Sequence, residues 1–82
     1  MSILILEAEI NILNQEVEQI AKEINLHDRK VRELRRNKQN KEADKEVKEV
    51  VNKLIEIAQT RERIIRKQND IIQELKIQLV RY

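Results

Sequence analysis

The chain contains no glycine, no proline and no cysteine in its 82 residues, and Tyr82 is its only aromatic residue. Without glycine or proline, few positions interrupt a helix, so helix can run through almost the whole chain. The absence of cysteine excludes disulfides and thiolate metal sites. With a single aromatic residue, any core must be aliphatic, and a surface that stacks nucleic-acid bases on several aromatic rings is excluded.

Long hydrophobic runs are also missing, since the longest uncharged apolar stretch comprises only the residues Ile3 to Leu6. A membrane-spanning helix needs about 20 such residues. The stretch has no basic flank and no small-residue cleavage site, so it does not resemble a signal peptide. The net charge of +2 is too small to require a polyanionic partner. We therefore expect a soluble protein, cytoplasmic if it is expressed in a cell, although the sequence identifies no compartment.

What the chain does contain is charge and aliphatic residues, with 39% charged and 40% hydrophobic residues. This composition, combined with a helical period, is typical of coiled coils and long helices. The length allows one small domain. Two helices alone cannot enclose a core, because each has only one neighbour. Since small scaffolds need a disulfide, a metal or a partner, oligomerisation is the remaining way to stabilise this one.

Apolar residues in the first half recur in alternating steps of three and four, the heptad spacing of coiled coils. With Ile3 at position a, every a residue is β-branched and three of the five d residues are leucine, which is compatible with knobs-into-holes packing. The a series comprises Ile3, Ile10, Val17, Ile24 and Val31, and the d series comprises Leu6, Leu13, Ile20, His27 and Leu34.

This register ends near the middle of the chain, because continuing it would bury four lysines between residues 38 and 48, and unpaired buried ammonium groups are costly. A second register begins after Ala43 with an apolar stripe up to three positions wide, as in a helix that contacts more than one neighbour. The stripe comprises Val47, Val50, Val51, Leu54, Ile57, Ala58, Arg61, Ile64, Ile65, Gln68, Ile71, Ile72, Leu75, Leu79 and Tyr82.

The polar segment between the two registers predicts a turn at residues 37–41. Asparagine both caps helix starts and tolerates the left-handed conformation that ends helices, so we expect Asn37 to close the first helix and Asn40 to cap the second. Basic residues before the turn and acidic residues after it also suit the two helix dipoles. The sequence therefore predicts a single antiparallel hairpin with helices at 3–37 and 41–80. The alternative is one continuous helix about 120 Å long.

In such a hairpin, the numbers of facing residues should add up to about 80, and this register sets acidic residues of the first helix against basic residues of the second. It brings His27 toward Asn52 and Lys53, and Gln68 toward Asn11 and Asn14. Because buried polar groups need partners, we expect a polar network between helices that specifies the assembly. Its members are Asn11, Asn14, His27, Asn52 and Gln68. His27, as a buried neutral imidazole, is also a candidate pH switch that would weaken the assembly on acidification.

No constellation in the sequence predicts catalysis, which requires a pocket and converging groups. The candidate nucleophiles Ser2, Thr60 and Tyr82 are not brought to His27 by the hairpin, and no glycine-rich phosphate loop exists. We therefore expect that the protein is not an enzyme and that it binds no cofactor, metal or small-molecule substrate. Nucleic acid is not an expected partner, although a basic cluster at the turn could touch phosphates. The candidate polyanion contacts are Arg32, Arg35, Arg36, Lys38 and Lys41.

Two short segments, Val31 to Leu34 and Ala43 to Val47, together with Lys38, Val51 and Leu54, resemble the WHEP helix-turn-helix appended to some eukaryotic aminoacyl-tRNA synthetases. The resemblance covers residues 26–58. It implies a basic hairpin that binds RNA or other proteins. The glycine usual before the first WHEP motif is replaced by Asp28, and the turn is about three residues longer.

The whole chain more closely resembles computationally designed helical hairpins that self-assemble through aliphatic layers and buried polar networks. The common features are two near-equal helices, regular heptads, and Asn or Gln at core-facing positions. We thus predict an all-α, antiparallel two-helix hairpin that forms a homo-oligomeric bundle. The predicted core and oligomer interface comprise Ile3, Leu6, Ile10, Leu13, Val17, Ile20, Ile24, Val31, Leu34, Val47, Val51, Leu54, Ile57, Ile64, Ile65, Ile71, Ile72, Leu75 and Leu79.

Overall fold

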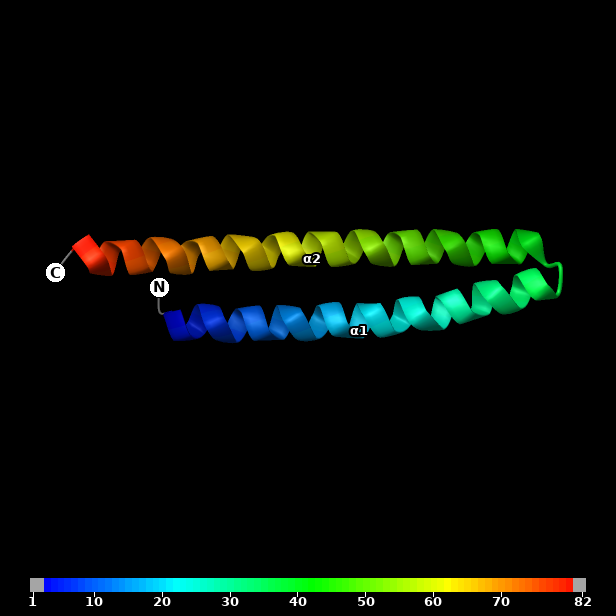
Figure 1. Ribbon diagram of the computed structural model, residues 1–82, viewed down its shortest axis with the longest axis horizontal. Coiled ribbons are helices and arrows are strands. Elements are labelled where there is room, and N and C mark those ends of the chain that lie inside the picture. The colour runs from blue at the N-terminus through cyan, green and yellow to red at the C-terminus, as the bar shows by residue number, and fades with distance from the viewer. Residues whose placement is uncertain (1–2, 81–82) are drawn as a thin grey trace.

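The computed structural model describes residues 3–80, which form two long helices, α1 (Ile3–Arg36) and α2 (Asn40–Val80). The helices lie side by side and run in opposite directions, joined by a short turn (Figure 1). The described part of the chain contains no β-strand. The helix ends lie within one residue of the predicted ones, and the alternative of a single continuous helix is wrong.

The hairpin is a rod with extents of 67 × 15 × 13 Å. Its radius of gyration is 19.0 Å, whereas a compact domain of this length would have about 12 Å. Each helix therefore has one helical neighbour, and much of its circumference faces outward. Neither α1 nor α2 carries an apolar stretch that would cross a lipid bilayer.

Ion pairs between the helices define their register. Lys53 lies 2.9 Å from Glu23, and Lys67 contacts Glu9, so the numbers of facing residues add up to 76 and not to the predicted 80 or so. The difference arises because the turn is centred near residue 38, two positions earlier than expected. As a result the start of α1 lies beside residue 73, and the last turns of α2 project beyond it (Figure 1).

The turn uses different residues from those predicted. Asn37 still donates a helical hydrogen bond to the carbonyl of Glu33 (3.1 Å), and the left-handed residue is Lys38, with φ of 59°. The amides of Lys38 and Gln39 then donate to the carbonyls of residues 35 and 34, at 3.1 and 2.8 Å, which is the Schellman arrangement that usually places glycine at the left-handed position.

The start of α2 also differs from the prediction, because Gln39 holds the N-cap position in place of Asn40. Its carbonyl accepts the first helical hydrogen bond, from the amide of Ala43 at 3.0 Å. Asn40 is thus the first residue of the helix. The compact Schellman turn leaves only residues 37–39 between the two helices, and each expected cap is displaced by one position.

Few side chains are fully buried between the two helices. The predicted inner positions of α1 all face α2 and are buried or half-buried, whereas α1 covers only one edge of the wide stripe on α2. The predicted core residues Val47, Val51, Leu54, Ile65, Ile72, Leu75 and Leu79 are therefore exposed in the hairpin. The buried hydrophobic residues are Leu6, Leu13, Ala43, Ile57 and Ile64.

Candidate assembly interface

One edge of the hairpin is a ladder of ion pairs between α1 and α2. Lys53 pairs with Glu23 at 2.9 Å, Lys67 contacts Glu9, and Glu46 pairs with Lys30 at 3.0 Å. On each helix these positions recur every seven residues, at 9, 16, 23 and 30 on α1 and at 46, 53, 60 and 67 on α2. This seven-residue repeat of charge was visible in the sequence and could have revealed the register.

The ladder stabilises the charged forms of Glu23, Glu46 and Lys53. The hydrogen bond between Lys53 and Glu23 raises the pKa of Lys53 and lowers the pKa of Glu23. The pKa of Glu46 is lowered first by the hydrogen bond from His27 and then by the one from Lys30. Because these groups are partly solvated, the ladder contributes more to helix orientation than to net stability.

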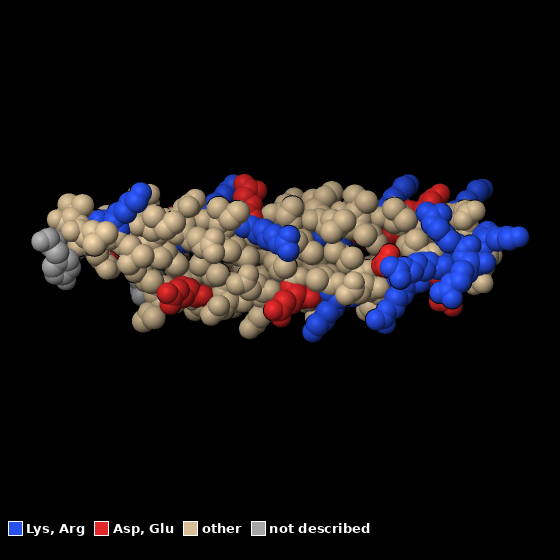
Figure 2. All heavy atoms as spheres, viewed as in Figure 1, with Lys and Arg blue, Asp and Glu red and all other residues tan. Residues whose placement is uncertain are grey.

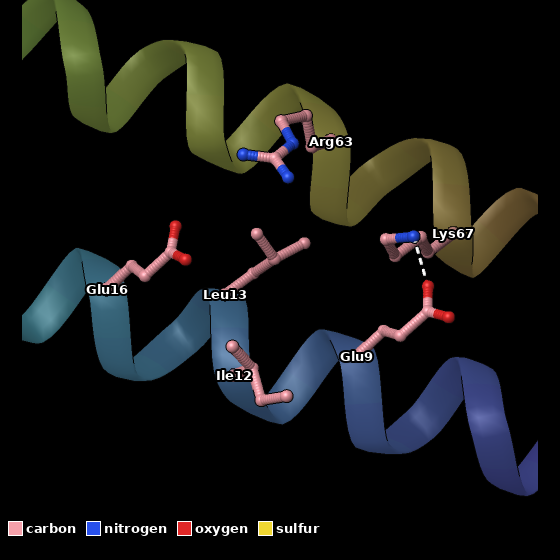
Figure 3. Close-up of a pocket in the computed structure, with 6 residues that line it drawn as sticks. All are labelled: Glu9, Ile12, Leu13, Glu16, Arg63 and Lys67. Atoms are coloured by element: carbon pink, nitrogen blue, oxygen red, sulfur yellow. Dashed lines mark hydrogen bonds and ion pairs between the residues drawn. The ribbon is translucent and has the colours of Figure 1, made fainter.

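The ladder is interrupted at residue 60, where α2 carries threonine in place of a charged residue. The Thr60 hydroxyl is buried and donates a 2.9 Å hydrogen bond to the carbonyl of Glu56 on its own helix. Glu16, which faces position 60 in this register, lines an open pocket of about 230 Å³. Figure 3 shows Glu16 and Arg63 directed toward this gap, with Leu13 at its floor and the Lys67–Glu9 contact at one end.

A face of α2 beside the one that meets α1 carries a second apolar row, which we name the second seam. Its ten positions alternate in steps of four and three, and each from Val51 to Leu75 directly follows a residue that faces α1. One residue corresponds to a rotation of about 100° around the helix, so the second seam points away from α1. The second seam comprises Val47, Val51, Leu54, Ala58, Arg61, Ile65, Gln68, Ile72, Leu75 and Leu79.

The residues predicted for a polar network are dispersed in the isolated hairpin. Asn11, Asn14, Asn52 and Gln68 are exposed, and only His27 is half-buried. The Nδ1 of His27 donates to a carboxylate oxygen of Glu46 at 2.6 Å, so its partner is neither of the two residues expected from the register. Contacts between hairpins, where such a network would form, stay a prediction.

The surroundings of His27 differ from those expected for an acid-triggered switch. Its imidazole is half-buried and not fully buried, and its Nδ1 faces the Glu46 carboxylate at 2.6 Å in place of an apolar layer. The pH switch at His27 stays a prediction.

Basic side chains gather at the end of the rod formed by the turn (Figure 2). Several of them are paired: Arg32 lies 2.9 Å from Asp28, and Arg35 lies 3.2 Å from Asp44. Lys30 pairs with Glu46 in the same region. The remaining candidate polyanion contacts, Arg36, Lys38 and Lys41, are exposed. Acidic neighbours therefore offset part of this positive charge.

Chemical groups that could act in catalysis are not brought together in the described hairpin. Ser2 and Tyr82 lie outside the described residues, and the Thr60 hydroxyl is held by its own helix. Across residues 3–80, no group of three or more His, Cys, Asp or Glu side chains could hold a metal ion.

Comparisons with known proteins identify no relative. No protein-family model matches the sequence, and neither a curated protein nor a solved structure shows significant similarity to it. The class of the protein therefore rests on its fold, an antiparallel α-helical hairpin with one charged and one apolar edge.

Proposed function

We propose that this chain is a structural self-assembly module, whose hairpins associate into a homo-oligomeric helical bundle. Aliphatic side chains form the layers between hairpins, and polar residues such as Gln68 join hydrogen-bond networks within them. The proposal involves no catalysis, cofactor or small-molecule substrate.

The distribution of hydrophobic surface supports this proposal. Within the described residues, five hydrophobic side chains are buried, whereas fourteen large hydrophobic residues are exposed. Apolar surface costs roughly 25 cal/mol per Å² when it contacts water, and soluble monomers rarely expose large contiguous patches of it. Since seven of the fourteen belong to the second seam, the exposure is concentrated on one helix face and is not scattered.

The concentration dependence of thermal unfolding tests this proposal. If hairpins fold and associate together, mass action raises the stability of a dimer by about 2.7 kcal/mol for a hundredfold increase in concentration. The Tm measured by circular dichroism should then rise by roughly 5 °C or more. A Tm that is constant from 1 to 100 μM, with full helicity, would show a self-sufficient monomer.

The basic end of the rod supports a second candidate, a WHEP-like module that docks RNA or a partner protein through its turn (Figure 2). A variant in which Arg35, Arg36, Lys38 and Lys41 are all changed to glutamine distinguishes the two proposed functions. A self-assembling bundle keeps its mass after this change. A docking module loses a salt-sensitive RNA complex, because counterion release at phosphates depends on those charges.

A further inference from the structure

We infer that a second copy of this chain docks antiparallel on the second seam, α2 against α2, with a twofold axis beside residue 63. Facing residue numbers then add up to 126. The inference rests on the proposed self-assembly and specifies its surface, its partner and its register.

The second seam is longer than α1 can cover. It extends from Val47 to Leu79, about 48 Å along the helix. The start of α1 reaches only residue 73, and Leu79 is 77% exposed. The 4-3 spacing nevertheless continues unbroken past that point. The helix that covers the seam must therefore be a helix other than the α1 of the same hairpin, and it must be at least as long as the seam. The α2 helix of a second copy has this length and carries apolar residues at the same spacing.

The angle between the two faces of α2 favours two hairpins. The α1-facing positions and the second seam differ by one residue, or about 100°. Helices at the corners of a four-helix bundle have their two neighbours about 90° apart, so α2 can pack on its own α1 and on the other copy's α2 at once. A strip 48 Å long and 10–12 Å wide covers on the order of 500 Å² in projection, approaching the roughly 800 Å² per partner of a standard interface.

The polar residues of the seam select the antiparallel orientation. A parallel, in-register pair would place Arg61 against Arg61 and Gln68 against Gln68 inside the interface, and like charges there are unfavourable. In the antiparallel register Arg61 faces Ile65 of the second copy and lies within one turn of that copy's Glu62. Gln68 faces Ala58, the smallest seam residue, which leaves room for the amide and its hydrogen-bond partners.

The same register leaves no seam position without a counterpart. Shifting it by one heptad in either direction leaves at least one residue at an end of the seam unmatched, so the centre at residue 63 buries the most apolar surface. The facing pairs in this register are Val47 with Leu79, Val51 with Leu75, Leu54 with Ile72, Ala58 with Gln68, and Arg61 with Ile65.

A matched pair of substitutions tests the surface. Ile72 is 47% exposed in the hairpin and Ile12, on α1 outside the seam, is 57% exposed, so aspartate at either position leaves the buried core intact. Because Ile72 faces the apolar Leu54 of the second copy and an unpaired charge in an interface core is costly, Ile72→Asp should raise the dimer dissociation constant at least about 100-fold, whereas Ile12→Asp should change it less than about fivefold. Equal effects of the two substitutions would overturn the assignment of the seam.

Cysteine cross-linking tests the register, and the chain has no cysteine of its own to interfere. Leu54→Cys and Ile72→Cys are combined in one chain, where the two positions lie about 27 Å apart on one helix and cannot join. The antiparallel register predicts covalent dimers in which position 54 is linked to position 72, as identified by peptide mapping. Links of 54 to 54 and of 72 to 72 would demonstrate a parallel pair and contradict the proposal.

The outcomes also separate this inference from the proposed function. An oligomer that keeps its mass in Ile72→Asp and forms no 54–72 link would overturn the seam, while self-assembly itself would stand. A wild-type chain that is monomeric at every concentration would overturn both.

Discussion

Replacement of Leu13 by alanine should cost a large part of the stability of this hairpin. Leu13 is 3% exposed and is one of five buried hydrophobic residues within residues 3–80, so few other contacts compensate for its loss. Leu→Ala substitutions in protein cores cost about 2–5 kcal/mol. Leu13 borders the open pocket lined by Glu16, where water and neighbouring side chains can fill part of the space, which places the expected cost near 2–3 kcal/mol. A chain of this length has roughly 4–12 kcal/mol in total.

The assay is urea unfolding followed by circular dichroism, at one fixed protein concentration so that association affects all variants equally. With a slope of about 1.5 kcal/mol/M, the Leu13→Ala midpoint should fall by about 1.3–2 M. Leu26→Ala is the matched control, since Leu26 lies on the same helix and is 64% exposed. Its expected cost is below about 1 kcal/mol. Equal midpoints for the two variants would refute the assignment of Leu13 to the core.

Three further predictions concern the turn, the ladder and pH. Lys38→Gly and Gln39→Ser should each raise the free energy of unfolding by about 0.5–1 kcal/mol, because glycine suits the left-handed position and serine is a better N-cap. Thr60→Lys should add up to about 1 kcal/mol by completing the ladder opposite Glu16. The free energy of unfolding should decrease as the pH falls below 4.5, the ordinary pKa of Glu46. The pKa of Glu46 is lower in the folded state, so its contacts are lost as the pH drops through this lower, folded-state pKa.

Chemical denaturation at pH 7 checks the first two predictions, and the same titration repeated from pH 7 to pH 3 checks the third. Destabilisation by Lys38→Gly would contradict the left-handed turn, and loss of stability in Thr60→Lys would show that the buried position 60 cannot hold a lysine. Glu46→Gln should flatten the acid limb of the pH profile. An unchanged acid limb in this variant would mean that other carboxylates govern it.

The helices and the inner face of α1 could be predicted because the signals for them are local. The β-branched and leucine positions of the first register identify the residues that face α2, and the polar segment after Arg36 marks the turn. For α2 the stripe is wider than one neighbour can cover, and nothing in its hydrophobic pattern distinguishes the edge that meets α1 from the edge that does not. The charges decide this choice, since Lys53 and Lys67 face the acids of α1.

The predictions of the helix register and of the helix caps at the turn were wrong for a related reason. Asparagine is the better residue for both a left-handed position and an N-cap, so local preference favoured Asn37 and Asn40. The ladder of seven-residue charge repeats instead sets the register, and the turn adopts Lys38 and Gln39 in those positions despite their lower preference. A pairing of Glu9 with Lys67 and of Glu23 with Lys53 would have given the correct register from the sequence.

The mass of the protein in solution is the most direct test of self-assembly. Size-exclusion chromatography with light scattering across a concentration series should give twice the chain mass of 9.9 kDa, the dimer that the second seam predicts. Any higher stable multiple would preserve self-assembly and discard the dimer. A helical species that stays at 9.9 kDa at every concentration would contradict self-assembly and leave the basic turn as the better explanation of the hairpin.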